Sequence, residues 1–96
     1  MTTPPIGPDE SLLPSAQVHG RRFDDEVVIL DLAGGEYYAL NAVGARIWEK
    51  LVGGSTPAEV ARLLEAEFEV DYPRAVSDCL ALADELVTRG ILRRRG

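Results

Sequence analysis

The sequence contains one cysteine and one histidine among its 96 residues. A single cysteine, Cys79, excludes an internal disulfide framework and a cysteine-based metal cage. No spacing of cysteine and histidine matches that of a metal site, and we expect no cofactor. This cysteine content is compatible with a reducing cytoplasm, which is the location we predict.

The chain also lacks long hydrophobic runs and an excess of positive charge. No run approaches the roughly 20 apolar residues of a membrane-spanning helix, and no secretory signal pattern opens the chain, so we expect no membrane partner. The net charge is −6, and three of the ten basic residues are Arg93, Arg94 and Arg95. Residues 1–92 therefore carry seven basic and sixteen acidic residues, a net charge of −9. Because phosphate backbones repel such a body, we expect no nucleic acid partner.

Catalytic groups are equally scarce. His19 falls on a predicted strand, and Cys79 falls on the core side of a predicted helix, so we expect packing roles for both. The acidic cluster of residues 24–26 lies in a predicted turn, where like charges usually face water. The glycine pairs 34–35 and 53–54 lack the lysine and the strand-to-helix context of a phosphate-binding loop. The sequence therefore predicts a binding module and not an enzyme.

The chain has enough hydrophobic residues, 46%, for one domain without covalent staples. Residues 1–14 hold four of the six prolines and have little to bury, so we predict a flexible arm in which Leu12 and Leu13 do not dock. We assign residues 15–92 to the folded domain. Residues 93–96 are expected to form a basic, solvated tail.

The domain is organised around residues 27–51. Residues 27–32 and 36–40 are rich in β-branched and aromatic side chains, which favours two strands. Between them, the glycine pair 34–35 suits the positive φ angles of a two-residue hairpin turn. Residues 17–22 predict one more strand ahead of these two. The three strands together form an antiparallel meander.

Three helices are predicted to follow the strands. Asn41 caps a helix over residues 42–51. The run Thr56-Pro57-Ala58-Glu59 is a capping box with proline at the first helical position, and it begins a helix that ends near Phe68. Asp71 begins a third helix that ends near Arg89. The predicted fold class is α+β, with a three-stranded antiparallel sheet followed by three α-helices.

The third helix carries more apolar surface than one core-facing stripe requires. Leu82 lies about 100° from the centre of that stripe, with Ala75 on the same flank and Asp78 beside it. This strip either packs on another part of the domain or is free to bind a partner. The third strand lies at a sheet edge with unpaired backbone groups. An extended peptide that added to this edge could place alternate side chains against the strip. The core-facing stripe itself comprises Tyr72, Val76, Cys79, Leu80, Ala83, Leu86 and Val87.

These segments also resemble a known family. The resemblance covers about residues 17–92 and is distributed along the chain. The sequence is similar to the PqqD family at Leu30-Asp31-Leu32, Gly34-Gly35, Tyr37-Tyr38-Ala39-Leu40-Asn41, Gly44, Ile47-Trp48, Leu51, Gly54, Thr56-Pro57-Ala58-Glu59, Asp78, Leu82, Leu86 and Arg89-Gly90-Ile91-Leu92.

The resemblance implies a RiPP recognition element, which is a small winged helix-turn-helix-like domain that binds the leader of a ribosomally made precursor peptide. In the family, the leader adds as a strand to the third strand, against the third helix. The module then delivers the leader to a partner enzyme, which is a radical SAM enzyme for PqqD itself and a leader protease in lasso peptide pathways. The short chain and its Leu-Asn-x-x-Gly-x-x-Ile-Trp run resemble the lasso peptide type most.

By the same resemblance, we expect nine peptide-binding residues on the two elements. Because neighbouring strand residues point to opposite faces, only one of Tyr37 and Tyr38 can face the helix, and the sequence leaves open which one. The acidity of the body is expected to favour basic leader residues. The nine residues are Glu36, Tyr37, Tyr38, Ala39, Leu40, Ala75, Asp78, Cys79 and Leu82.

Two other functions remain open at this point. A winged-helix DNA-binding regulator shares the architecture, but its recognition helix needs several exposed basic residues. The third helix has only Arg74 and Arg89, against three carboxylates. A structural subunit or a homodimer would instead use the strip around Leu82 as a protein interface.

Overall fold

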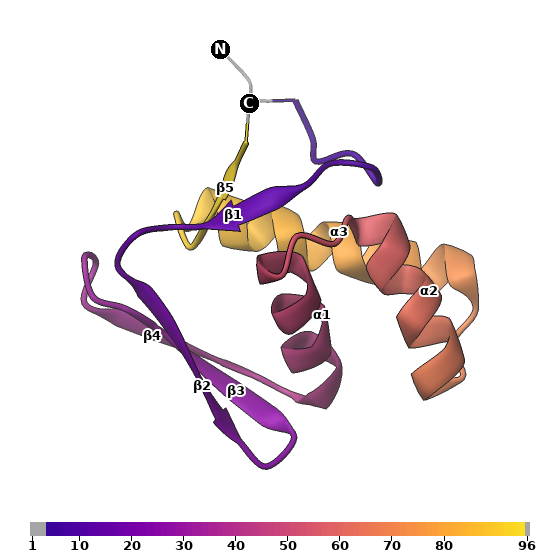
Figure 1. Ribbon diagram of the computed structural model, residues 1–96, viewed down its shortest axis with the longest axis horizontal. Coiled ribbons are helices and arrows are strands. Elements are labelled where there is room, and N and C mark those ends of the chain that lie inside the picture. Colours follow the sequence, from indigo (N-terminus) through magenta and orange to yellow (C-terminus); the bar gives the residue numbers. More distant parts are fainter. Residues whose placement is uncertain (1–3, 96) are drawn as a thin grey trace.

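The computed structural model describes residues 4–95, which form five strands and three helices (Figure 1). The main sheet is antiparallel with the strand order β2-β3-β4. It is followed along the chain by the three helices, which confirms the predicted fold class. The elements in chain order are β1 (Leu12–Pro14), β2 (Val18–Phe23), β3 (Glu26–Asp31), β4 (Glu36–Leu40), α1 (Ala42–Val52), α2 (Pro57–Phe68), α3 (Tyr72–Thr88) and β5 (Leu92–Arg94).

The helices begin where the sequence places their caps. The Asn41 side chain accepts a hydrogen bond from Gly44 N–H at 2.9 Å at the start of α1. Thr56 and Glu59 form the reciprocal capping box of α2. Asp71 is the N-cap residue of α3, but its side chain makes no capping hydrogen bond. All three helices therefore begin where the sequence predicts, and side-chain capping accounts for the starts of α1 and α2.

The turn between β3 and β4 differs from the predicted two-residue hairpin turn. Asp31 pairs with Glu36 at the end of the ladder, so four residues, 32–35, connect the strands. Asp31 organises this connection, because its carbonyl accepts from Gly35 N–H at 2.9 Å and its carboxylate accepts from Gly34 N–H at 3.1 Å. Gly35 has a φ of 68°, which is the position where the turn requires glycine.

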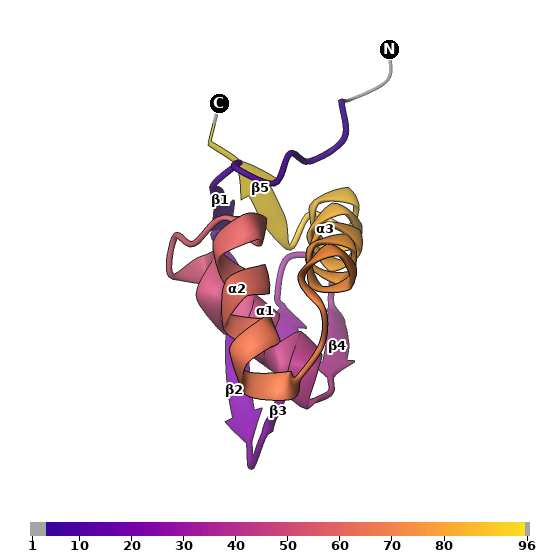
Figure 2. The same ribbon diagram turned by 90° about the vertical axis from the view of Figure 1, so that its right-hand side faces the viewer.

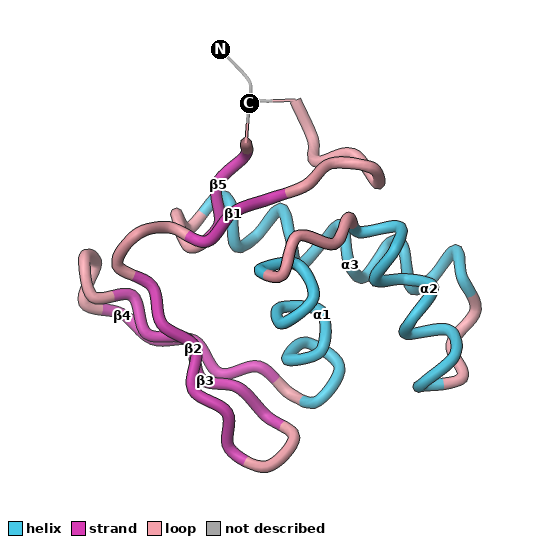
Figure 3. The backbone as a smooth tube through the Cα atoms, in the orientation of Figure 1, coloured by secondary structure: helices cyan, strands magenta, loops and turns pink. Residues whose placement is uncertain are grey.

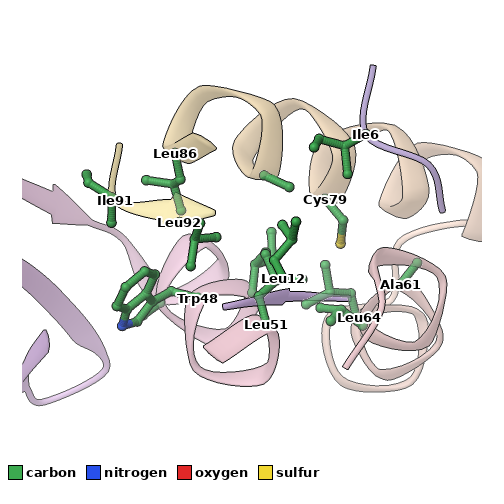
Figure 4. Packing of buried hydrophobic residues seen from close by; sticks show 14 of the residues in the cluster. Ile6, Leu12, Trp48, Leu51, Ala61, Leu64, Cys79, Leu86, Ile91 and Leu92 are labelled. Carbon is green, nitrogen blue, oxygen red and sulfur yellow. The ribbon is translucent and has the colours of Figure 1, made fainter. Parts of the chain in front are cut away.

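The expectation that residues 1–14 have little to bury is wrong for two of them. Ile6 and Leu12 are buried in the core, where Leu12 lies beside Leu51 (Figure 4). Leu12–Pro14 form β1, which pairs antiparallel with β5 in a second, two-stranded sheet, apart from the main sheet (Figure 3). Residues 12–14 include no β-branched or aromatic side chain, so this segment has no strand signal of its own. The strand forms because it pairs with β5 at the other end of the chain, although the prolines of the arm disfavour regular structure.

The tail is likewise part of the fold as far as residue 94. Leu92 is buried, and the Arg94 guanidinium donates to the Glu10 carboxylate at 2.7 Å and to the Pro5 carbonyl at 3.0 Å. We call the assembly of β1, β5 and the Glu10–Arg94 pair the clasp. No helix within residues 4–95 is long and apolar enough to cross a membrane.

Candidate functional site: an open strand edge beside α3

The main sheet leaves β4 at an edge, because β3 pairs with β2 on one side and with β4 on the other. Tyr38 lies opposite Ile29, whose side chain is fully buried, and is itself packed against the core. Tyr37 points to the opposite face, where it is 72% exposed. The structure thus answers the question that the sequence left open: Tyr38, and not Tyr37, faces the helices.

The backbone groups that β4 leaves open can be read from the ladder. Leu32 N–H donates to Gln17 O at 2.9 Å. Leu30 and Val28, the alternate residues before Leu32, therefore direct their backbone hydrogen bonds to β2. Hydrogen-bonded and non-bonded pairs alternate along an antiparallel ladder. Glu36, Tyr38 and Leu40 therefore direct their backbone groups toward β3. Tyr37 and Ala39 direct theirs to the open edge.

Helix α3 reaches this edge with its C-terminal end. Figure 2 looks almost along the helix axis and shows β4 below it. The Arg89 guanidinium, directly after α3, lies 5.1 Å from the centroid of the Tyr38 ring. Residues 78, 82, 85 and 89 share one flank of the helix by their spacing. We call this flank the α3 stripe; it comprises Asp78, Leu82, Glu85 and Arg89.

A chain of polar contacts joins the two elements. The Tyr38 hydroxyl donates to the Glu36 carboxylate, and Arg89 Nε donates to Glu85 Oε1 at 3.2 Å. The hydrogen bond to Glu36 is the main reason that the pKa of Tyr38 is raised, while Arg89 acts in the opposite direction. Glu85 thus lies beside the Arg89 guanidinium, and Glu36 is connected to it through Tyr38. Asp78 lies three helical turns earlier on the α3 stripe.

Two of the nine expected site residues are not at the surface. Ala75 and Cys79 are 0% exposed and belong to the core. Burial raises the pKa of the Cys79 thiol to about 11, with the nearby Asp78 carboxylate as a second cause. Neither residue can touch a peptide in this conformation. Both residues belong to the core-facing stripe of α3, whose buried members are Ala75, Cys79, Ala83 and Leu86. Of the expected strip, Asp78 is exposed and Leu82 is half-buried.

Sequence reasoning missed Glu85 and Arg89. A signal for both was present, because they follow Leu82 by three and seven residues and so continue its flank of the helix. The expected strip was extended toward Ala75, at the N-terminal end of α3, whereas the helix meets β4 at its C-terminal end.

Two hollows of the described surface lie away from this edge. One of about 260 Å³ lies between the β2–β3 turn and helices α1 and α2, where Arg22 pairs with Glu49 and Arg46 with Glu67. Another of about 400 Å³ lies between the arm and the far flank of α3, beside Ile6 and Val87. No group of three or more His, Cys, Asp or Glu side chains within residues 4–95 could hold a metal ion. A strand edge, however, binds through its backbone and needs no deep pocket.

Comparison with known proteins places the chain. Residues 26–92 match the family model described as coenzyme PQQ synthesis protein D (PqqD). The chain belongs to the PqqD family. No curated protein matches it.

Two solved structures are similar to this PqqD-family chain. One, described as TbiB1 in complex with the TbiA(beta) leader peptide, is 38% identical, with a TM-score of 0.78 over 83% of this chain and 93% of that one. The other, described as lasso peptide synthetase B1 complexed with the leader peptide, is 33% identical, with a TM-score of 0.78 over 85% of this chain and 96% of that one. Both relatives therefore match over nearly their whole length.

Proposed function

We propose that this PqqD-family protein is a RiPP recognition element that binds the leader of a precursor peptide as a fourth strand on β4. The open edge of β4 beside the α3 stripe carries this proposal. It is supported by two relatives, 38% and 33% identical, whose structures contain a leader peptide. Glu36, Leu40 and the other β4 residues form one side of the site, and Asp78 and Leu82 are on the other.

The β3–β4 ladder supports one pairing pattern for the added strand. The leader backbone exchanges hydrogen bonds with Tyr37 and Ala39, whose groups point to the open edge. The leader side chain opposite Tyr38 then points toward Leu82 and Arg89. Each backbone hydrogen bond contributes a net of about 0.5–1.5 kcal/mol for any sequence, so selectivity must come from the side chains that meet the α3 stripe.

Charge gives a second level of selectivity. Glu36, Asp78 and Glu85 outnumber Arg89 at the site, and the whole chain carries a net charge of −6. Basic leader residues are favoured at the rim, mainly through faster association, and added salt lowers the affinity. The same acidity disfavours the DNA-binding alternative, for which the comparisons also offer no support.

The protein does not itself change the peptide in this proposal. It holds the leader and delivers the precursor to a modifying enzyme, which is a leader protease if the pathway is of the lasso type. A radical SAM enzyme is the corresponding partner in a PQQ-type pathway. The likeness to lasso peptide synthetase B1 favours the protease.

Fluorescence anisotropy tests leader binding with a labelled TbiA(beta) leader peptide and with the leader of the precursor encoded beside this chain. Ala39→Pro removes an N–H that points to the open edge and none that bonds to β3, so proline is tolerable there. We expect saturable binding by the native chain and at least a tenfold loss in Ala39→Pro. Ala39→Ser keeps the N–H and is the matched control, with an affinity within about twofold of native.

Other outcomes would overturn the proposal. Equal binding by Ala39→Pro and the native chain would exclude hydrogen bonding at this edge. Binding of a duplex DNA at moderate salt, with no binding of either leader, would instead favour the regulator.

A further inference from the structure

Helix α3 forms one side of the proposed leader site, but most of its packing is with elements outside the main sheet. Within the described residues, α3 packs mainly on α2 and β5, whereas α1 packs on β3 and β4. The one contact between the two sides of the site that involves a charge is the Arg89 guanidinium near the Tyr38 ring, and both side chains are open to water. The spacing between α3 and β4 must therefore be set by another part of the chain.

The C-terminal end of α3 has a defined backbone conformation. Gly90 N–H donates to Val87 O at 3.0 Å, and Ile91 N–H donates to Leu86 O at 2.9 Å. These are the two hydrogen bonds of a Schellman motif, in which Gly90 takes the left-handed conformation with a φ of 78°. Leu86 and Ile91 are both buried (Figure 4). The motif does not use the Gly90 and Ile91 carbonyls, which can therefore accept hydrogen bonds from elsewhere in the chain.

Ser15 hydrogen-bonds to both of these carbonyls. Its hydroxyl donates to Gly90 O at 2.5 Å, and its backbone N–H donates to Ile91 O at 2.9 Å. The backbone bond extends the β1–β5 ladder by one step, because Pro14 pairs with Leu92. The hydroxyl bond is made by a side chain, so it depends on which residue occupies position 15.

Ser15 is also connected to the main sheet. Its carbonyl accepts from Val18 N–H at 3.3 Å, and Val18 pairs with Asp31 of β3. The same end of the sheet is where β4 begins, since Asp31 also pairs with Glu36. Figure 1 shows the bend between β1 and β2 near the C-terminal end of α3. Ser15 thus joins the end of α3 to the end of the sheet at which β4 starts.

The hydrogen bonds of Ser15 act on the part of α3 that faces the leader edge. Arg89 directly precedes Gly90, and its guanidinium lies 5.1 Å from the centroid of the Tyr38 ring. Glu85 and Leu82 lie about one and two helical turns before Arg89 on the α3 stripe. A shift of the helix end therefore moves the stripe relative to β4 and changes the space that the leader side chains enter.

Ser11 provides a comparison within the same segment of the chain. Its hydroxyl donates to Gly54 O at 3.3 Å, so both serines bond to the carbonyl of a glycine. Ser11 Oγ also accepts from Arg95 Nε at 2.9 Å. Both serines are half-buried. Gly54, however, lies in the connection between α1 and α2, away from the α3 stripe and the β4 edge.

We propose that Ser15 is a positioning residue for leader recognition, which holds the C-terminal end of α3 at the distance from β4 that an added strand requires. This inference rests on the proposed leader binding and adds how the N-terminal segment contributes to it. Ser15 acts through α3 and not by contact with the leader. Without the hydroxyl bond, the end of α3 moves among several positions. The apparent dissociation constant then rises as the fraction of binding-competent protein falls.

Fluorescence anisotropy tests this with the labelled TbiA(beta) leader peptide and with the leader of the precursor encoded beside this chain. We expect Ser15→Ala to weaken binding about three- to tenfold, which is the effect of one hydrogen bond. Ser15→Thr keeps a hydroxyl and should restore the affinity to within about twofold of native. Ser11→Ala is the matched control, with an affinity also within about twofold of native. Thermal melting should show similar stability for the two alanine variants, so that a difference in affinity is not a difference in folding.

Two further measurements separate positioning from a general loss of structure. Hydrogen exchange at the Gly90 and Ile91 amides, measured without leader, should be faster in Ser15→Ala than in native or Ser11→Ala protein. A double-mutant cycle with Leu82→Ala tests whether Ser15 acts through the α3 stripe. In the Leu82→Ala background the stripe contributes less to binding, so Ser15→Ala should weaken the affinity by at most about twofold more.

The positioning role and the proposed function fail on different results. Native leader affinity in Ser15→Ala, or equal losses in Ser15→Ala and Ser11→Ala, would overturn the positioning role and leave leader binding intact. A full Ser15→Ala loss in the Leu82→Ala background would also overturn it, because Ser15 would then act independently of the stripe. Absence of binding of either leader by the native chain would instead overturn the proposed function.

Discussion

The clasp and the β4 edge are two strand-pairing regions with opposite designs. In the clasp, two three-residue strands pair with each other, bury Leu12 and Leu92 and carry an ion pair between Glu10 and Arg94. At the β4 edge, five residues pair on one side only. The clasp uses its strands to close the chain. The β4 edge keeps one side open, which is where a ligand can add.

The comparison teaches that strand length and hydrophobicity do not decide which region binds. The clasp is shorter and richer in proline, yet its side chains are buried in the core. The β4 edge has the better strand sequence, but its backbone hydrogen bonds are only half used. Mutations should therefore separate the two regions: clasp changes affect stability, and edge changes affect binding.

The largest expected effect comes from the clasp. Leu12→Ala removes a side chain that is 0% exposed, and it should lower the free energy of unfolding by about 2–5 kcal/mol. Urea denaturation followed by circular dichroism measures this. Leu32→Ala is the matched control, because Leu32 is 61% exposed and its loss should cost within about 0.5 kcal/mol. A cost for Leu12→Ala no larger than for Leu32→Ala would mean that the clasp does not belong to the core in solution.

The next effect belongs to the leader site. Leu82→Glu places a carboxylate on the α3 stripe, and it should weaken leader binding at least tenfold, which corresponds to about 1.4 kcal/mol. Val87→Glu is the matched control, because it introduces the same charge into a half-buried position on the far flank of α3, beside the arm. Anisotropy should show near-native leader affinity for Val87→Glu. Similar losses for both variants would point to a general change in α3 and against the stripe.

Sequence reasoning recovered the parts of the fold that local signals determine. Caps at Asn41 and Thr56 and the β-branched run of β3 place the sheet and the helices nearly to the residue. The pairing of β1 with β5 could not be predicted in this way, because β1 has no strand signal of its own and its partner lies about 80 residues away in the chain. The pairing of Leu12 with Arg94 is set by the assembled fold.

The candidate site was recovered on its strand side better than on its helix side. Alternation along β4 limits the choice to two faces, and one buried neighbour, Ile29, decides it. A helix offers a continuous range of flanks, and the covered part of that range depends on how α2 packs on α3. The sequence therefore identified Leu82 and Asp78 but also included Ala75 and Cys79, which that packing buries.

The smallest expected effect concerns the ion pair of the clasp and depends on pH. The hydrogen bond from Arg94 is the main reason that the pKa of Glu10 is lowered from its ordinary value of 4.5. A carboxylate with a lowered pKa in the folded state stabilises the fold above its ordinary pKa and loses that contribution as the pH falls through the folded value. Arg94→Gln should therefore lower the free energy of unfolding by about 0.5–1 kcal/mol at neutral pH.

The difference between native and Arg94→Gln protein should shrink as the pH falls below 4.5, because Glu10 becomes protonated in both. Urea denaturation of the two proteins across this pH range gives the comparison. Arg89→Gln is the matched control, since it removes an exposed pair within one helix turn, with Glu85, and should cost no more than about 0.5 kcal/mol. An Arg94→Gln cost that is independent of pH would assign the role of Arg94 to its bonds with the Pro4 and Pro5 carbonyls, and the arm would then be held by its backbone instead of by the Glu10 charge.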